Sequence, residues 1–366
     1  MKLCFVMPEY NPADATHFSH IADFVQEAST LTDIFLIIER GVKPRGNLGC
    51  RSVHALRFQS LPLRMLELLS SLFLIRLKGV KTFYIHYSFV AAWSAAIITA
   101  LFGGRVFYWN CGEPWKYQRS FLRNIFERLA YRVIDMLVTG TEKMKMRYAQ
   151  EYGIPLSKIA VMPNWIMLER FSFSDAQSNQ VREQLNIPAG TPILLFIHRL
   201  SRRKGAHHLP VLLEKLHDEK FVLIIIGDGP ERRIIESGIE RLGMSEKVRF
   251  IGNVPNREIL HYYAAADAFI MPSEEEGFPR VLLEAMATRT SFAAFDVGGV
   301  REIVPPEFQR YVAPSADVDA FARIVRELLH LPDYEKKELG RIALSWVQQF
   351  SIQPVARKFF AILSHS

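Results

Sequence analysis

Cysteine is scarce in this chain of 366 residues, which contains only Cys4, Cys50 and Cys111. Three cysteines so far apart cannot build a disulfide framework, and no C-x-x-C pair indicates a zinc site. Long apolar runs are also missing, since the longest uncharged apolar stretch, 89–102, is shorter than the roughly 20 residues that span a bilayer. The apolar run at 1–7 is too short for a signal peptide. We therefore expect a cytoplasmic protein without a membrane span.

The remaining composition is that of a folded protein with two domains. Hydrophobic residues make up 49% and charged residues 23% of the chain, which is ordinary for globular proteins. The charge is unevenly distributed: residues 1–165 hold 20 Lys and Arg against 12 Asp and Glu, whereas residues 166–366 hold 25 against 26. A cationic half indicates a partner with negative charge, such as nucleic acid, anionic lipid or a phosphorylated substrate.

Short apolar runs alternate with amphipathic segments through most of the chain. The pattern predicts strands at 3–7, 34–38, 82–86, 105–109 and 136–139, and again at 193–198, 222–226, 248–251, 268–271 and 291–295. Helical periodicity fills most segments between them. Strands that alternate with helices form parallel sheets. The predicted fold class is therefore α/β, with two doubly wound domains that bind ligands at the carboxyl ends of their strands.

A polar stretch at 164–180 separates the two series of strands. We therefore place an N-terminal Rossmann-like domain at 1–165 and a second Rossmann-like domain at 166–345. The last segment, 346–366, has helical periodicity that must break or restart at Pro354. We expect this segment to pack back on the N-terminal domain.

The most informative motif follows the fourth strand of the second series and reads PSEEEGFPRVLLEAMA from Pro272 to Ala287. Its second proline suits the first turn of a helix. Glu276 then lies in the loop at the carboxyl end of the strand, and Glu284 lies about one and a half turns into the helix. The free backbone amides of Arg280 and Val281 form an anion site. The alternative is that the three consecutive glutamates are solvated charges that favour a helix N-terminus.

A second motif reads FIHRLSRRKG from Phe196 to Gly205. Its strand ends near Arg199, and a short loop brings Lys204 to the start of the next helix. A guanidinium that binds through two N–H groups, together with an ammonium, suits a diphosphate. A solvated basic loop is the alternative.

A third motif reads IIIGDGP from Ile224 to Pro230, a strand followed by a glycine turn. Gly227 and Gly229 permit a tight turn and the close approach of a ligand. Turns of this kind also occur in α/β proteins for packing reasons alone.

Together and in this order, these motifs resemble the retaining glycosyltransferases of family 4. The resemblance extends through Phe250-Ile251-Gly252 and Asp296-Val297-Gly298-Gly299, and so covers the second half of the chain. It implies the GT-B fold, in which two Rossmann-like domains face an interdomain cleft. It also implies a hexosyltransferase-like enzyme that uses a nucleotide-diphosphate sugar and requires neither a metal nor a cofactor, because basic side chains and helix amides replace the cation.

The resemblance assigns roles to individual residues. Arg199 and Lys204 would hold the donor diphosphate and neutralise charge on the leaving group. Glu276 would contact hydroxyls of the donor sugar, and with the basic pair it completes the expected catalytic set. Glu284 would contact the donor ribose. The remaining donor-binding positions are Gly227, Gly229, Phe278, Arg280 and Val281.

The first half of the chain matches the family less well. The loop 8–17 lacks the glycines that relatives carry there. Asn110 stands where relatives often have a histidine, which leaves Glu113 as an acceptor-side candidate together with Asn110 and His86. In the alternative interpretation, Asn110 only forms a turn and His86 is a hydrogen-bonded structural residue.

Cations and aromatic residues are interleaved in one segment of the first half. Residues 116–147 carry eight Lys and Arg against three Asp and Glu. With the leucine-rich segment 61–77, this region predicts a surface that contacts an anionic membrane. The alternative is that the apolar residues are core and the cations are solvated. The first reading places the enzyme at the inner face of the membrane.

The sequence therefore favours a glycosyltransferase that acts on a glycan or a lipid-linked glycan, in the synthesis of cell-surface polysaccharide or glycolipid. A nucleotide-sugar epimerase or hydrolase of the same fold is the first alternative. A non-catalytic nucleic-acid-binding protein is the second, suggested by an isoelectric point near 9.2. No RNA-binding signature supports it, and nucleic acid is not an expected partner.

Overall fold

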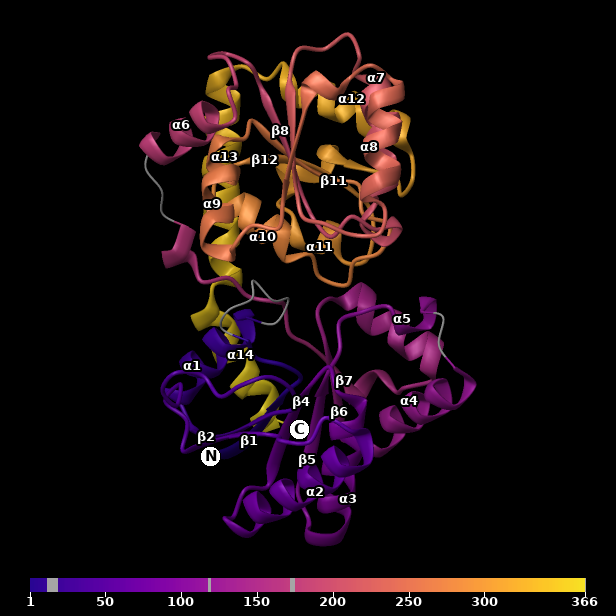
Figure 1. Cartoon of the computed structure of the whole chain (residues 1–366). Coiled ribbons are helices and arrows are strands. Elements are labelled where there is room, and N and C mark those ends of the chain that lie inside the picture. Colours follow the sequence, from indigo (N-terminus) through magenta and orange to yellow (C-terminus); the bar gives the residue numbers. More distant parts are fainter. Residues whose placement is uncertain (12–18, 118–119, 172–174, 366) are drawn as a thin grey trace. The chain divides into compact units, whose positions relative to one another are not determined.

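The structure, a computed structural model, describes residues 1–11, 19–117, 120–171 and 175–365. Contacts divide the chain into two compact units: unit 1 comprises Met1–Asn164 and Ile352–Ser366, and unit 2 comprises Trp165–Ser351. Each unit is built around one parallel sheet with helices on both faces (Figure 1). The predicted α/β class is therefore confirmed.

The sheet of unit 1 has seven strands in the order β3-β2-β1-β4-β5-β6-β7, and all neighbouring strands are parallel. The five predicted strands are present, and the structure adds the short edge strands β3 and β7. The strands are β1 (Lys2–Met7), β2 (Asp33–Ile38), β3 (Ser52–Ala55), β4 (Thr82–His86), β5 (Arg105–Trp109), β6 (Met136–Thr139) and β7 (Ile159–Val161).

Four helices cover one face of this sheet and two cover the other. The first group is α2 (Leu61–Leu77), α3 (Phe89–Phe102), α4 (Phe121–Val133) and α5 (Glu142–Tyr152), which share one buried cluster. The second group is α1 (Ser19–Ser29) and α14 (Ile352–His365), which lie side by side (Figure 1). Phe359 of α14 packs against Phe24 of α1 and Tyr84 of β4. Pro354 lies in the first turn of α14, where its missing N–H breaks no helical hydrogen bond.

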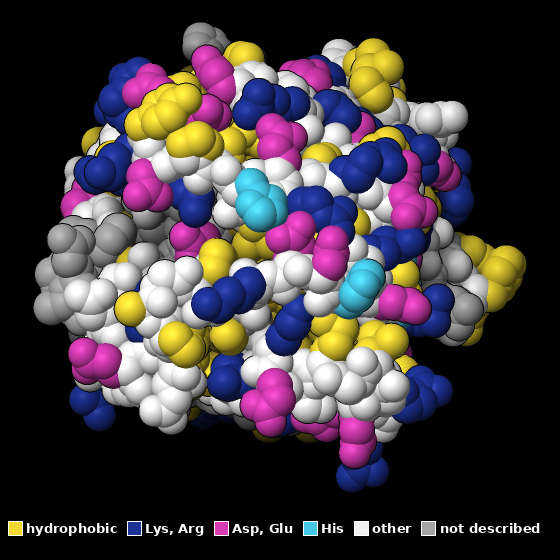
Figure 2. Space-filling model, turned by 90° about the horizontal axis from the view of Figure 1, so that it is seen from above, with side chains coloured by type: hydrophobic (Ala, Val, Ile, Leu, Met, Phe, Trp, Pro, Cys, Tyr) yellow, Lys and Arg dark blue, Asp and Glu magenta, His cyan; other side chains and the backbone are white. Residues whose placement is uncertain are grey.

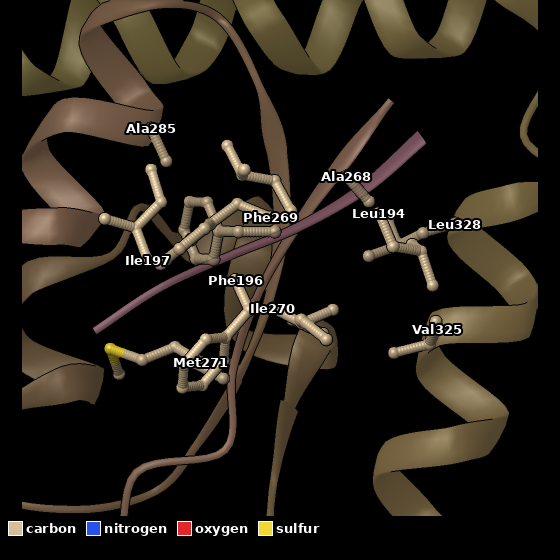
Figure 3. Close-up of a cluster of buried hydrophobic side chains, with 14 of the residues drawn as sticks. Leu194, Phe196, Ile197, Ala268, Phe269, Ile270, Met271, Ala285, Val325 and Leu328 are labelled. Carbon is tan, nitrogen blue, oxygen red and sulfur yellow. The ribbon is translucent and has the colours of Figure 1, made fainter. Parts of the chain in front are cut away.

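The sheet of unit 2 has six strands in the order β10-β9-β8-β11-β12-β13. They are β8 (Ile193–Ile197), β9 (Val222–Ile226), β10 (Val248–Gly252), β11 (Ala268–Met271), β12 (Ser291–Phe295) and β13 (Val312–Ala313). Strands β8 and β11 are buried on both faces. Figure 3 shows their side chains between Ala285 on one side and Val325 and Leu328 on the other. This order places β8 and β11 next to each other at the centre, so the motifs that follow them leave the sheet at one point.

The helices of unit 2 also lie on two faces (Figure 1). One face is covered by α7 (Leu209–Lys215), α8 (Arg232–Arg241) and α12 (Val318–Leu329). The other is covered by α9 (Asn256–Ala265), α10 (Arg280–Ala287) and α13 (Asp333–Val347), with α6 (Asp175–Gln184) against α9. Helix α6 occupies part of the polar stretch 164–180, and the short α11 (Val300–Ile303) follows β12.

No helix among the described residues is both long and apolar enough to cross a membrane. The face shown in Figure 2 carries Lys and Arg side chains interspersed with Asp and Glu, without a large area of one sign.

Candidate active site

Two loops at the carboxyl ends of neighbouring strands form the centre of the candidate site. The basic loop, residues 198–208, follows β8, and the glutamate loop, residues 272–279, follows β11. Backbone hydrogen bonds join them, because the N–H groups of Glu274 and Glu275 both donate to the carbonyl of Arg203, at 3.0 and 3.1 Å. The two most informative sequence motifs are therefore brought into direct contact within unit 2.

Ion pairs connect the same two loops side chain to side chain. The Nζ of Lys204 lies 2.6 Å from Oε1 of Glu276, and the Nε of Arg203 lies 2.9 Å from Oε2 of Glu275. The Glu276 carboxylate is buried, whereas the Arg203 side chain is about half exposed. The buried Lys204–Glu276 pair is thus the stronger constraint on the site, since solvent screens the exposed pair.

The pKa of Glu276 is lowered although the group is buried. Burial alone would raise this pKa, but the positive charge of Lys204 and the nearby His198 outweigh that effect. The Nε2 of His198 lies 3.4 Å from Oε1 of Glu276. Glu276 is therefore a carboxylate at neutral pH, able to accept hydrogen bonds from hydroxyl groups.

The pKa of Glu284, on α10, is shifted in the opposite direction. Burial raises it, and the partial opposition of Arg280 and Tyr263 does not cancel that effect. The Tyr263 hydroxyl lies 3.4 Å from Oε2 of Glu284, and the Arg280 guanidinium lies 4.0 Å from Oε1. The two glutamates, eight residues apart in the sequence, thus differ in their electrostatic environments.

The start of α10 presents backbone N–H groups at Arg280 and Val281, as the motif predicted, after the N-cap residue Pro279. Phe278, predicted as a donor-binding position, has a buried side chain. Its ring is buried and packs edge-on against Phe350, with centroids 5.8 Å apart. Its side chain therefore anchors the glutamate loop to the core of unit 2.

Two glycines allow the backbones of the site loops to touch. A Cβ atom on Gly205 would lie 1.6 Å from the carbonyl oxygen of Pro272, and one on Gly298 would lie 1.6 Å from that of Glu276. Both glycines have positive φ, 67° and 52°, which other residues rarely adopt. No side chain fits at either position without moving the glutamate loop.

Gly227 and Gly229 lie in the turn after β9, beside the basic loop. The N–H of His198 donates to the carbonyl of Ile226 at 3.1 Å, and that of Leu200 donates to the carbonyl of Asp228 at 3.0 Å. The glycine turn therefore supports the backbone on each side of Arg199. The Arg199 side chain is exposed, and its guanidinium forms no hydrogen bond or ion pair with the described residues.

Unit 2 also contains an Asp-x-Asp sequence, Asp317-Val318-Asp319, of the carboxylate type that can hold a divalent cation. Both carboxylates have other partners here. Asp317 accepts a hydrogen bond from the N–H of Ala320 at 2.8 Å and so caps α12. Asp319 pairs with Lys215 at 2.5 Å. This pair of aspartates has a structural role.

The predicted acceptor-side residues lie in unit 1. His86, at the end of β4, is fully buried. Its ring stacks on Trp109 with centroids 5.5 Å apart and on Phe5 at 6.2 Å. The structure thus places His86 within an aromatic stack that fills the carboxyl end of the sheet.

Asn110 and Glu113 follow β5 and are both buried. Asn110 donates to the Tyr131 hydroxyl at 3.1 Å and accepts from the N–H of Gly112 at 3.1 Å, the pattern of a turn-forming asparagine. Glu113 pairs with Lys116 at 2.9 Å. The two residues therefore lie on the same short segment, each with a partner from its own unit.

Sequence reasoning did not single out two further residues at this edge. Tyr87 has φ of 61°, an unfavourable conformation for a bulky side chain that often marks a functional segment. Its hydroxyl lies 2.6 Å from Sγ of Cys111. Glu39, after β2, is buried and accepts from the Ser88 hydroxyl at 2.9 Å. No spacing in the sequence indicated either residue.

Comparison with known proteins supports the assignment of unit 2. The model of the family described as "Glycosyl transferases group 1" matches residues 177–343. A 2-deoxystreptamine glucosyltransferase from Streptomyces kanamyceticus is 29% identical over 234 residues, which are 63% of this chain and 60% of the relative. The chain thus spans less than two thirds of that relative's length.

Solved structures resemble the whole chain. Sucrose-phosphate synthase from Thermosynechococcus elongatus superposes with a TM-score of 0.82 at 20% identity, over 99% of this chain and 98% of that one. Anabaena HepE, solved with UDP and glucose, superposes with a TM-score of 0.79 at 18% identity, over 100% of both chains.

Two doubly wound units with these strand orders define the GT-B class of glycosyltransferase folds. Within that class, residues 177–343 of unit 2 match the model of the group 1 glycosyl transferases. The resemblance read from the motifs at 199–205, 227–230 and 276–284 is confirmed at the level of the family.

Proposed function

We propose that the protein transfers a hexose from a nucleoside-diphosphate sugar to a glycan or lipid-linked glycan. The main support is the contact between the basic loop and the glutamate loop, which places Lys204 2.6 Å from Glu276. The exposed Arg199 belongs to the same basic loop. The similarity of the chain to the Streptomyces kanamyceticus glucosyltransferase and to HepE, solved with UDP and glucose, supports this assignment.

The basic pair binds the donor diphosphate in this proposal. Arg199 offers an uncommitted planar guanidinium that can donate two parallel N–H groups to phosphate oxygens. Lys204 is held in place by Glu276 at 2.6 Å and keeps further N–H groups for a second oxygen. The N–H groups of Arg280 and Val281 add donors that need no cation. When the bond from sugar to phosphate breaks, these donors stabilise the negative charge that develops on the nucleoside diphosphate.

The two glutamates bind different parts of the donor in this proposal. Glu276, kept ionised by Lys204 and His198, accepts hydrogen bonds from sugar hydroxyls. Glu284, eight residues further on, binds the ribose hydroxyls. The sugar is transferred with retention of its anomeric configuration, and NMR of the first product tests this by the anomeric coupling constant.

The acceptor binds to unit 1 in this proposal. Asn110, Glu113 and His86 lie at the carboxyl ends of β4 and β5. Asn110 and Glu113 are the polar candidates for a hydroxyl of the acceptor. The stack of His86 with Trp109 shapes the floor beneath them. A donor-dependent transfer assay with Glu113→Gln and Asn110→Ala tests this placement, and an unchanged KM for the acceptor would contradict it.

An anionic membrane surface is a further proposed partner of unit 1, at the inner face of the membrane. The first turns of α4 expose Phe121, Leu122, Ile125 and Phe126, with Phe121 77% exposed. The neighbouring helices α2 and α3 expose Leu61, Leu66, Leu74, Leu77, Ile97, Leu101 and Phe102. Such apolar side chains beside cations are typical of interfacial binding.

Arginines accompany this apolar surface. Arg123 and Arg128 of α4 are exposed, and the Arg123 guanidinium lies 5.7 Å from the centroid of the Phe89 ring. Arg119, which the charge pattern also included, lies outside the described residues. We propose that these cations bind lipid phosphates while the phenylalanines enter the headgroup region, which brings the enzyme to a lipid-linked acceptor.

The experiment that tests the proposed function is a donor screen. The purified full chain is mixed with a panel of nucleoside-diphosphate sugars, and native mass spectrometry records binding and slow hydrolysis. We expect one sugar nucleotide to bind and to release its nucleoside diphosphate. Binding of none of the panel would contradict the proposal. Conversion of the donor into an epimer would favour the epimerase alternative, and strong salt-dependent binding of generic oligonucleotides would favour the nucleic-acid alternative.

A further inference from the structure

Two histidines and one glutamate converge beside the donor-side loops of unit 2. His207 and His208 are consecutive residues of the short 3₁₀ helix η5 (Ala206–His208), and Glu274 belongs to the glutamate loop. The Nε2 atoms of His207 and His208 lie 3.1 and 3.0 Å from the same oxygen, Oε1 of Glu274. One ligand atom from each residue lies within 4.8 Å of the others.

This donor set is that of an open three-ligand zinc site. Two imidazole nitrogens and one carboxylate oxygen bind Zn²⁺ at about 2.0–2.2 Å, with a fourth position left for water. At such bond lengths the ligand atoms of a tetrahedron lie about 3.3 Å apart. The two distances from the histidine nitrogens to Oε1 of Glu274, 3.0 and 3.1 Å, differ little from that spacing, and the ligand atoms all lie within 4.8 Å of one another. Mg²⁺ and Ca²⁺ prefer sites made of oxygen ligands and do not fit this one.

The three side chains are held in place without an ion. The N–H of Glu274 donates to the carbonyl of Arg203 at 3.0 Å, which fixes the glutamate loop against the turn that precedes η5. The His208 ring packs edge-on against Phe295, with centroids 5.5 Å apart. The histidine side chains are 18% and 13% exposed, and that of Glu274 is 35% exposed. An ion and a water ligand can therefore enter from solvent, while little side-chain freedom remains to be lost.

The nearest charges act in both directions. Arg203 would repel an ion, but Glu275 pairs with its guanidinium at 2.9 Å. The positive charge of Arg202 also reaches His208 and opposes a cation there. Glu274 contributes a negative charge that faces two imidazoles rather than a lysine or arginine. The simpler alternative is that Oε1 of Glu274 only accepts one N–H from each histidine. The experiment below separates the two interpretations.

We propose that His207, His208 and Glu274 form a binding site for a divalent transition-metal ion of the Zn²⁺ type. The ion would join the basic loop to the glutamate loop three residues from Lys204 and two from Glu276, and so fix the spacing of that pair. It is not a participant in sugar transfer. The site stands independently of the proposed function, because metal binding is measured without any nucleotide.

Equilibrium dialysis of the full chain against buffered Zn²⁺, followed by elemental analysis, tests the site. We expect one Zn²⁺ per chain, and at least tenfold weaker binding in Glu274→Gln and in His208→Gln. Circular dichroism of the metal-free variants checks that they are folded. With Co²⁺ as probe, the wild type should develop the intense visible absorption of a tetrahedral ion, which a hydrogen-bonded cluster cannot produce.

His330→Gln is the matched control, because it removes a histidine that has a single glutamate partner, Glu219, at 2.8 Å. It should bind Zn²⁺ as the wild type does. Absence of stoichiometric Zn²⁺ in the wild type, or equal affinity in Glu274→Gln, would overturn the proposal. So would Mg²⁺ binding with the affinity of Zn²⁺.

Discussion

The two units place different chemistry at the carboxyl ends of their strands. In unit 2, the loops after β8 and β11 are joined by the Lys204–Glu276 and Arg203–Glu275 ion pairs. In unit 1, the ends of β4 and β5 are filled by the stacked rings of His86 and Trp109. The same doubly wound topology thus has charged side chains at the carboxyl ends of its strands in unit 2 and aromatic side chains there in unit 1. The topology fixes where a ligand binds, and the side chains fix what kind of ligand it is.

The outer surfaces differ in the same way. Unit 2 has nearly equal numbers of cations and anions, and unit 1 is strongly cationic. The start of α4 in unit 1 also exposes six consecutive residues, four of them apolar. The proposed function places the phosphates of a small donor on unit 2 and a broad, lipid-facing surface on unit 1. Each of the following predictions tests one side of that division.

The largest effect is expected at the basic pair of unit 2. Arg199→Ala and Lys204→Ala should each lower turnover by roughly 30- to 1,000-fold, because each removes a charged donor worth about 2–4 kcal/mol in the transition state. Binding of free nucleoside diphosphate should weaken in parallel. Steady-state kinetics and calorimetry measure both quantities.

Arg202→Ala is the control for that pair, since Arg202 is an exposed cation of the same loop without an assigned part in donor binding. It should leave turnover close to that of the wild type. If Arg199→Ala behaved like Arg202→Ala, the charged side chains at the carboxyl ends of the unit 2 strands would not form the donor site.

Substitution of the two glutamates should affect different quantities, turnover for Glu276 and nucleotide affinity for Glu284. Glu276→Gln keeps the shape of the side chain but removes the charge that Lys204 and His198 stabilise. Turnover should fall about tenfold or more while nucleotide affinity stays nearly constant. Glu284→Ala should instead weaken the binding of free nucleotide, because the proposed partner of Glu284 is the ribose. If calorimetry showed weaker nucleotide binding in Glu276→Gln and unchanged binding in Glu284→Ala, the roles proposed for the two glutamates would have to be exchanged.

The membrane surface of unit 1 should produce smaller, salt-sensitive effects. Each cation near an anionic surface contributes about 1 kcal/mol, so Arg123→Ala and Arg128→Ala should each weaken binding to phosphatidylserine vesicles about fivefold. Higher ionic strength should reduce the binding of the wild type. Co-sedimentation measures both effects.

Phe121→Ser should weaken vesicle binding without lowering the thermal stability, because the ring is 77% exposed. Arg241→Ala, an exposed cation of unit 2, is the matched control and should bind as the wild type does. A wild-type chain that is folded but does not bind vesicles at low salt would contradict the membrane proposal.

The smallest effect is the pH dependence of stability. The pKa of Glu276 is lowered in the folded chain, so its stabilising contribution is present above the ordinary glutamate pKa of about 4.3 and is lost as the pH falls through the lowered value. The pKa of Glu284 is raised, so its contribution is complete below the ordinary value and is lost as the pH rises through the raised one.

Thermal unfolding of Glu276→Gln and Glu284→Gln at several pH values, compared with the wild type, measures these two contributions. Glu276→Gln should be less stable than the wild type at neutral pH and should approach it in acid. Glu284→Gln should match the wild type in acid and exceed it at neutral pH. The same sign of change in both variants would show that the two carboxyl groups share one environment.

Much of the central architecture was predictable from local pattern. Nine of the ten predicted runs became internal strands, because continuous apolar runs are stable when buried on both faces. The tenth, at 248–251, became the edge strand β10, most of whose residues are only partly buried. The strands that the pattern missed, β3, β7 and β13, are short edge strands, and β13 has only two residues. Their conformation depends on pairing with a neighbouring strand rather than on their own periodicity.

Helix α12, which follows the last predicted strand, has a helical pattern in its sequence. Its buried positions Phe321, Ala322, Val325, Leu328 and Leu329 follow the spacing of one helix face. The sequence of helix α6 gives a weaker indication of a helix, because it is almost entirely polar, and such a composition is also typical of a linker.

The sequence by itself determined the α/β class, the places where strands end in chemically active loops, and the family resemblance, because each depends on residues close together in the chain. Tertiary structure alone decided which of those residues meet. Lys204 and Glu276 are 72 residues apart, and they pair because β8 and β11 are neighbours in the sheet. The same adjacency brings His207 and His208 to Glu274, and packing turns Phe278 into the core. Long-range strand order sets these contacts, and no local pattern encodes it.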